Sequence, residues 1–292
     1  MRVFFFGAGF LDFLAGFFFA MPHGRIARLV GQRGNKPNCT TTEAYHIAGF
    51  CVGDERLVKQ PMKTYRAFIA LLGACSVASV SLADVNSVSA AEKAEGWKSL
   101  FDGVNLNGWR GYNADKPGEG WAVVDGTIMV KSKGGDLLTK DAFGDFELSF
   151  DWKVTETANS GVIYRVGLGE RASYITGPEY QVLDNEKAED NKQHDHLAAS
   201  LYDLALELNA KTKPVGEWNS GRIRVRGWHV EHWLNGEKVV DVDLASPAGK
   251  AMIQSSKFKD WEKFASLPRG HIALQEHGHD VSFRAIKIRE LR

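Results

Sequence analysis

Cysteine is absent from the larger, C-terminal part of this chain of 292 residues. All three cysteines, Cys39, Cys51 and Cys75, come before residue 95. The region after that point therefore has no disulfide, no thiol nucleophile and no thiolate metal site. An excess of charge of either sign is missing as well, because 36 Lys and Arg residues balance 36 Asp and Glu residues. A neutral chain does not favour a polyanionic partner, and we expect no binding of nucleic acid.

A membrane-spanning hydrophobic run is also lacking in the segment that begins at Met62. Basic residues Lys63 and Arg66 precede an apolar stretch over 67–74 or slightly beyond, and small residues follow. This stretch is shorter than the roughly 18–20 residues that cross a bilayer. The pattern predicts a secretory signal peptide over 62–91, and hence a periplasmic or secreted protein with no membrane span. Ser81-Leu82-Ala83 and Val88-Ser89-Ala90 are both acceptable cleavage contexts.

Two further expectations concern this N-terminal part. Leu72-Gly73-Ala74-Cys75 resembles a bacterial lipobox, which would place a lipid anchor on Cys75, although the apolar run past Cys75 favours ordinary cleavage. Residues 1–61 show no sustained helical or strand period. Because a signal peptide belongs at a terminus, we predict that native translation starts at Met62 and that 1–61 is a non-native upstream extension.

Residues 95–292 show the alternation of short β-strands. In Phe146–Val154 every second residue is large and apolar, which indicates a half-buried strand. Asp125-Gly126 and Asn235-Gly236 are strong hairpin turns between alternating runs, and the phase shift near Arg284-Ala285 indicates a bulge. The best helix candidate is Lys259–Pro268. No Pro-, Gly- or Ser-rich linker divides the region, which favours a single β-sandwich or jelly roll.

The run GPEYQVLDN, residues 177–185, carries unusual polar side chains for a strand. Glu179 and Gln181 are two apart and share a face, whereas Asp184 turns to the other face or into the following loop. Carboxyl and amide groups on a sheet surface suit the hydroxyls of a sugar. The alternative is that they are solvated residues at a sheet edge.

Seven motifs in order resemble the 3-keto-disaccharide hydrolase family: GVIYRV, GPEYQVLDN, SLYDL, KPVGEWN, HWLNGEKV, HIALQEHG and VSFRAIKIREL. The resemblance covers residues 95–292. It implies an all-β, concanavalin A-like jelly-roll sandwich with one or two short helices, export, and action on small carbohydrates whose C3 hydroxyl is oxidised to a ketone. Some members are described as 3-keto-glucoside 1,2-lyases and 3-keto-2-hydroxy-glucal hydratases. Ala199 departs from the pattern, which usually has glycine there.

The implied chemistry needs a base at C2, an acid at the glycosidic oxygen and donors for an enolate oxygen at C3. Elimination followed by addition of water then gives net hydrolysis. Candidate catalytic residues are Glu179, His196, His277 and Tyr202. Of these, His196 matches the family's histidine before the LYDL-like run. The alternatives are a solvated carboxylate for Glu179, a core tyrosine for Tyr202 and a surface histidine for His277.

Candidate substrate-binding residues are Arg165, Gln181, Asp184 and Trp233. A buried Arg165 needs an anionic partner, for which a salt bridge to Glu179 is the structural alternative. Asp184 is equally suited to starting a turn. Of Trp218, Trp228 and Trp233, which can all stack on a sugar ring, at least one is expected in the core.

We expect no cofactor, although His194-Asp195-His196 can bind a divalent metal if the segment is extended. The leading function is an exported enzyme that cleaves 3-keto-glucosides by elimination and hydration. A noncatalytic, lectin-like carbohydrate-binding module and a conventional glycoside hydrolase are the alternatives, since fold alone does not fix function.

Overall fold

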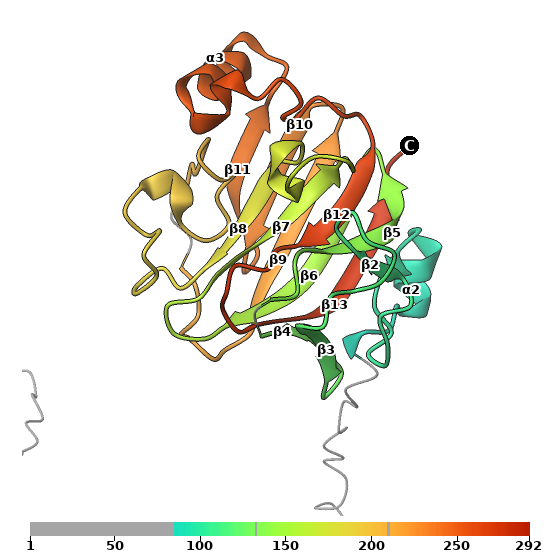
Figure 1. Ribbon diagram of the computed structural model, residues 1–292. Helices are drawn as coiled ribbons and strands as arrows, with labels where there is room; N and C mark the ends of the chain where they lie inside the picture. Colours follow the sequence, from blue (N-terminus) through green and yellow to red (C-terminus); the bar gives the residue numbers. More distant parts are fainter. Residues whose placement is uncertain (1–84, 132, 209–210) are drawn as a thin grey trace, which may run out of the picture. The chain divides into compact units, whose positions relative to one another are not determined.

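The computed structural model describes residues 85–131, 133–208 and 211–292, and in these residues the strands form two antiparallel sheets that pack as two layers (Figure 1). The larger sheet has the order β11-β10-β9-β6-β13-β4-β3, with β1 also paired to β13, and the smaller has the order β2-β5-β12-β7-β8. The predicted all-β sandwich is confirmed. The larger sheet consists of β1 (Lys98–Ser99), β3 (Trp121–Val124), β4 (Thr127–Val130), β6 (Phe146–Val154), β9 (Asn219–Arg226), β10 (His229–Leu234), β11 (Glu237–Asp243) and β13 (Val281–Glu290). The smaller consists of β2 (Trp109–Gly111), β5 (Leu137–Phe143), β7 (Asn159–Val166), β8 (Glu179–Leu183) and β12 (Gly270–Leu274).

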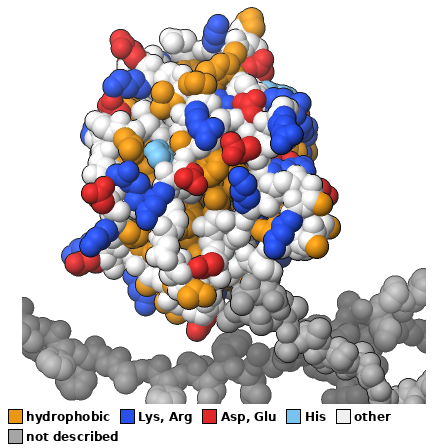
Figure 2. Space-filling view, turned by 90° about the vertical axis from the view of Figure 1, so that its right-hand side faces the viewer, with side chains coloured by type: hydrophobic (Ala, Val, Ile, Leu, Met, Phe, Trp, Pro, Cys, Tyr) orange, Lys and Arg blue, Asp and Glu red, His pale blue; other side chains and the backbone are white. Residues whose placement is uncertain are grey.

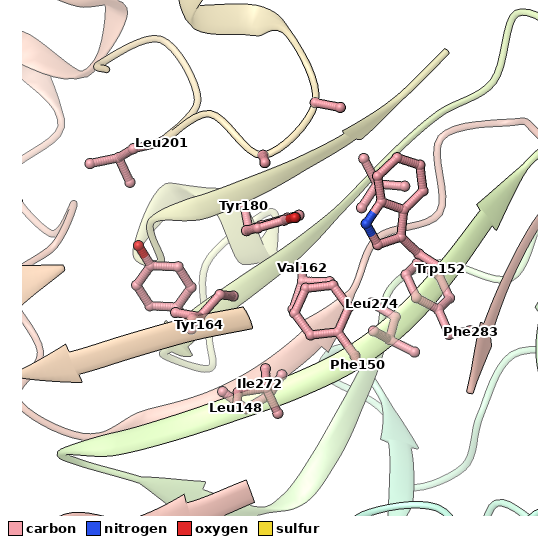
Figure 3. Packing of buried hydrophobic residues seen from close by; sticks show 14 of the residues in the cluster. Leu148, Phe150, Trp152, Val162, Tyr164, Tyr180, Leu201, Ile272, Leu274 and Phe283 are labelled. Atoms are coloured by element: carbon pink, nitrogen blue, oxygen red, sulfur yellow. The ribbon is translucent and has the colours of Figure 1, made fainter. Parts of the chain in front are cut away.

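The core lies between the two layers. Strand β6 spans the predicted residues and buries Leu148, Phe150 and Trp152 on its inner face. Figure 3 shows these side chains in one cluster with Tyr164 of β7 and Tyr180 of β8 from the smaller sheet, and Phe150 meets Tyr180 edge to face with ring centroids 5.2 Å apart. Burial of this aromatic and aliphatic surface is the main force that holds the layers together.

The predicted turns and bulge are confirmed. Asp125 (φ 48°) and Gly126 (φ 70°) join β3 to β4, and Asn235 (φ 50°) and Gly236 (φ 90°) join β10 to β11. Two successive positive φ values match the twist of a tight hairpin. In β13 the register with β6 shifts between Arg284 and Lys287.

The helix predicted over Lys259–Pro268 is wrong. The chain forms the 3-10 helix η3 (Lys257–Asp260) and then turns, and a left-handed φ of 50° at Ala265 prevents helical continuation. The apolar spacing instead serves an aromatic cluster in which Phe258 stacks on Phe264 with ring centroids 3.8 Å apart. Helix α3 lies just upstream at Pro247–Ser255, where Ser246 caps the first turn and Pro247 is compatible with its start.

Ala199 has φ 69°, a conformation that favours glycine. Its carbonyl accepts a hydrogen bond from His232 Nδ1 at 3.0 Å, and His232 Nε2 lies 3.1 Å from the hydroxyl of Tyr164. Burial lowers the pKa of His232 to about 4. This histidine is therefore a neutral link between the sheets and the loop before Leu201.

The outer face of the smaller sheet positions the site described below. Alternation turns Val162 and Tyr180 toward the core, so that Gly161, Glu179 and Gln181 share the opposite face. On a different side of the domain, Figure 2 shows acidic and basic side chains interspersed.

The predicted extension 1–61, most of the signal peptide from Met62 and the lipid site at Cys75 lie outside the described residues. The described chain begins with a folded segment that includes helix α2 (Ala90–Ala94), capped by Ser89 and Glu92. Other 3-10 helices are η1 (Ser173–Ile175) and η2 (His194–His196). Among the described helices none is long and apolar enough to cross a membrane.

Candidate active site

A hollow of about 340 Å³ opens on the outer face of β7 and β8. Its floor contains polar residues from three neighbouring strands or their ends, and its walls come from loops far apart in the sequence. The floor consists of Asn159, Glu179, Gln181 and Gln275, and the walls include Arg171, Tyr174, Asp190, Tyr202, Lys257, Phe258, Trp261 and His277. An aromatic wall beside a polar floor suits the apolar faces and the hydroxyl edges of a sugar ring.

Glu179 is the buried acid of this hollow. The residue is 8% exposed, and in the described part of the chain no group donates a hydrogen bond to its carboxyl. Burial, opposed by the charge of Lys257, raises the pKa of Glu179 from 4.5 to about 8. A carboxyl that titrates near neutral pH and opens only into a hollow is suited to proton transfer.

Glu179 fits because Gly161 lies beneath it. These residues are diagonal neighbours on the paired strands β7 and β8. A Cβ atom at position 161 would lie 2.0 Å from Glu179 Oε1 and 2.7 Å from its Cδ. Glycine is therefore required for the observed position of the carboxyl.

Two cations face the same hollow. Lys257 is an exposed residue, but its ammonium lies 4.0 Å from the ring centroid of Tyr202. Partial burial lowers the pKa of Lys257, although the negative charge of Glu179 acts in the opposite direction. Arg171 is exposed at another wall. Both can stabilise negative charge that develops on a bound substrate.

Asp190 connects the hollow to a buried histidine. Its Oδ2 accepts a hydrogen bond of 2.8 Å from the Tyr202 hydroxyl, and its Oδ1 lies 2.7 Å from His196 Nδ1. His196 Nε2 in turn lies 3.0 Å from Asp203 Oδ1. Both ring nitrogens of His196 are thus engaged by carboxylates, and its ring does not line the hollow. Burial, followed by the bond to Asp190, raises the pKa of Tyr202, which keeps the phenol protonated.

The structure brings together four of the eight predicted site residues, namely Glu179, Gln181, Tyr202 and His277. Gln181 is buried and its amide nitrogen lies 3.5 Å from Asp190 Oδ2. His277 is exposed at the rim, its ring stacked on that of His279 at 6.3 Å.

Three other predicted residues, Arg165, Asp184 and Trp233, do not line the hollow. Arg165 is buried, bonds to the carbonyls of Gly144 and Gly227, and pairs at 2.9 Å with Asp145 rather than with Glu179. Asp184 caps the following turn by accepting bonds from the backbone of Thr157, Glu186 and Lys187.

Trp233 lies in strand β10 of the larger sheet, and the guanidinium carbon of Arg222 lies 4.5 Å from the centroid of its indole ring. Trp218 and Trp228 are likewise beside Arg284 and Arg165. The tryptophan in the hollow is Trp261.

His194 and His196 do not point to a common position. His194 Nε2 lies 3.0 Å from the carbonyl oxygen of Leu206, whereas His196 lies between Asp190 and Asp203. The segment is a 3-10 helix and not the extended chain that a paired ligand site would need.

Four lining residues of the hollow were not predicted from the sequence: Asp190, Arg171, Lys257 and Trp261. Asp190, Arg171 and Trp261 lie in loops or turns and Lys257 begins the short 3-10 helix η3, so that no strand or α-helix period marks the direction of these side chains. A signal was present only for Trp261, as an aromatic residue in a polar segment beside Lys257.

The fold and the site define a β-sandwich protein with a carbohydrate-type site on the open face of one sheet. Residues 96–289 match the 3-keto-alpha-glucoside-1,2-lyase-like domain, and the chain belongs to this family. A 3-keto-disaccharide hydrolase of Bacteroides thetaiotaomicron is 34% identical over 248 residues, which cover 73% of this chain and 84% of that protein.

Two crystal structures from Parabacteroides distasonis, both described as candidate glycosyl hydrolases, have the same fold. The first is 32% identical, has a TM-score of 0.67 and covers 71% of this chain and 99% of its own. The second is 31% identical, has a TM-score of 0.55 and covers 67% of this chain and 99% of its own.

Proposed function

We propose that this protein is an exported enzyme that cleaves 3-keto-glucosides, including 3-keto-disaccharides, by 1,2-elimination followed by hydration. The observation that carries the proposal is the Glu179 carboxyl, which is buried, has no hydrogen-bond donor in the described chain and faces two cations across the hollow. Family membership supports the substrate class.

In the first step Glu179 removes the proton at C2, which the C3 ketone acidifies. The electron pair forms an enolate whose oxygen is stabilised by Lys257 and Arg171. The enolate then expels the glycosidic oxygen from C1, and His277 at the rim donates a proton to it. The products are an alcohol and a 3-keto-2-hydroxy-glucal.

In the second step the same groups act in reverse order. His277 accepts a proton from water as its oxygen adds to C1, and Glu179 returns a proton to C2, so that the sum is hydrolysis. Tyr202, Asn159 and Gln181 surround Asp190, and together they hold the hydroxyls of the sugar ring. His196 is a positioning residue, because it orients Asp190 rather than touching the substrate.

The substrate ketone is expected to be essential. A glucoside oxidised at C3 should be cleaved, and its unoxidised parent should not, because only the ketone makes the C2 proton acidic. In D₂O, with exchange of the protonated Glu179 carboxyl with solvent between the two steps, the released 3-keto-glucose should carry one deuterium at C2, measured by mass spectrometry against product incubated without enzyme.

Each alternative gives a different result in this assay. Cleavage of the parent sugar would show a conventional glycoside hydrolase, and binding without turnover would show a lectin-like module. Chelation followed by readdition of single divalent ions tests the expectation that no metal is needed.

Export is expected to leave residue 84 as the mature N-terminus. Asn86 is 1% exposed, donates to the Gly126 carbonyl at 2.8 Å and accepts from the Ala285 backbone at 2.8 Å. Cleavage after Ala83 keeps this anchor and the Ser89 cap, whereas cleavage after Ala90 removes both.

Intact-mass analysis of protein exported from a bacterial host, expressed from Met62, measures the site. A mature chain that begins at residue 91 would contradict the expectation, and a lipid-modified chain that begins at Cys75 would identify a lipoprotein.

A further inference from the structure

A second basin of about 700 Å³ adjoins the hollow that contains Glu179. The two share Asn159, Asp190, Tyr202 and His277. Glu179, Lys257 and the aromatic wall belong to the first alone, and four residues belong to the second alone: Thr157, Lys187, Glu189 and His279. A ligand in one space therefore meets a ligand in the other at the shared residues.

We propose that the second basin is the leaving-group subsite and that it selects an uncharged sugar as the group released from C1. The proposal rests on the proposed function. It orients the substrate, with the keto ring over Glu179 and against the aromatic wall, the scissile oxygen beside the shared residues, and the leaving sugar between His279 and Glu189.

The chemistry of the basin walls favours a polyol. Carboxylates accept, the Lys187 ammonium donates and imidazoles do either, so that hydroxyl groups find partners of both kinds. Apart from the imidazoles of His277 and His279, the one aromatic ring that lines this basin in the described chain is that of Tyr202, which gives an aryl leaving group less surface to stack on than the first hollow offers. The lining cation Lys187 pairs at 2.9 Å with Glu156, and two carboxylates also line the basin, so that a phosphorylated leaving group meets no net positive field.

The loop that carries Glu189 is held in place. Ala188 is 1% exposed, its backbone N–H donates to the Asp184 carbonyl, and the Asn191 side chain donates to the carbonyls of Asn185 and Glu186. Asp190 is fixed by His196 in the same loop. The basin is thus formed before a ligand binds, which lowers the ordering cost of binding.

The location of the shared residues also supports His277 as the proton donor. It lines both spaces, and its ring has no hydrogen-bond partner among the described residues. Glu179 lines the inner hollow alone, where the C2 proton of the keto ring would lie.

The test compares two substrates with the same keto ring. One is a disaccharide oxidised at C3 of its non-reducing glucose, and the other is methyl 3-keto-glucoside, which has no leaving sugar. Wild-type kcat/KM should be at least about tenfold higher for the disaccharide, and His279→Ala and Glu189→Ala should each reduce this ratio by about tenfold. Glu186→Ala, on the same loop with its side chain outside both spaces, is the matched control and should keep the wild-type ratio.

Each outcome is informative. If both basin variants keep the wild-type ratio, or if p-nitrophenyl 3-keto-glucoside is preferred through a lower KM, the leaving-group subsite is wrong while the proposed function stands. If the wild-type protein cleaves neither substrate, the proposed function fails and this inference fails with it. Thermal unfolding of both variants shows whether a change in ratio accompanies loss of folded protein.

Discussion

Glu179→Gln is expected to lower kcat for a 3-keto-glucoside by about 10³-fold, because it removes the base at C2 and leaves the shape of the hollow unchanged. In the wild type, kcat/KM should rise with pH up to about 8, since the carboxylate of Glu179 is the form that acts as base. The pH profile of kcat/KM measures this rise. A Glu179→Gln variant with near wild-type turnover would remove this residue from the mechanism.

The same substitution is expected to stabilise the fold at high pH. The pKa of Glu179 is 4.5 in its unperturbed state and about 8 in the folded protein, so the folded state binds more protons between these values. The free energy of unfolding therefore falls as pH rises from about 4.5 to 8, and the full cost of burying the charged carboxylate is present above 8. Glutamine is uncharged and avoids this cost, so Glu179→Gln should raise the free energy of unfolding by roughly 2–4 kcal/mol at pH 9. Below pH 4.5 the two proteins should be equally stable.

Glu147→Gln is the matched control for stability. Glu147 is also buried, at 3% exposure, but it forms ion pairs with Arg222 and Arg289. Its replacement should destabilise the protein by about 1–3 kcal/mol. Calorimetric unfolding of the three proteins at pH 4.5 and 9 tests the opposite signs, and destabilisation by Glu179→Gln at pH 9 would contradict the assigned environment of Glu179.

Gly161→Ala is expected to reduce kcat/KM by about 10²-fold or more while the protein stays folded. The added methyl group would lie 2.0 Å from Glu179 Oε1, so the carboxyl must move by roughly 1 Å or more to restore an ordinary contact. Displacement of a catalytic group by that distance is enough for a loss of this size. Steady-state kinetics on the 3-keto substrate and circular dichroism measure the two properties.

Two comparisons show whether the loss acts through Glu179. Gly108→Ala should be neutral, because its Cβ would have the carbonyl of Leu100 as its nearest neighbour at 3.7 Å. In the Glu179→Gln background, Gly161→Ala should cost little further activity, since the base is already absent. Full additivity of the two losses would show that Gly161 acts by another route.

Local pattern determined most of the fold. The alternation in Phe146–Val154 gives β6 its buried face, and Asp125-Gly126 and Asn235-Gly236 form the hairpins that their sequence demands. These features depend on neighbours in the chain, and their physics is local. The helix prediction for residues 259–268 was wrong because the apolar spacing there fits both a helix and the aromatic cluster around Phe258. Only tertiary packing selects between the two.

For the candidate site, the sequence determined that Glu179 and Gln181 share one face of a strand, since a period of two fixes this without further information. The sequence did not determine which face of this strand is covered by the other sheet. Arg165 was expected to bind the sugar and instead pairs with Asp145. The cations that line the hollow are Arg171 and Lys257. Loops have no period, and tertiary packing alone brings Asp190, Lys257 and His277 around one carboxyl. The close approach of the Glu179 carboxyl to Gly161, where an added Cβ would lie 2.0 Å from Oε1, likewise depends on the register of β7 with β8, which motif order does not encode.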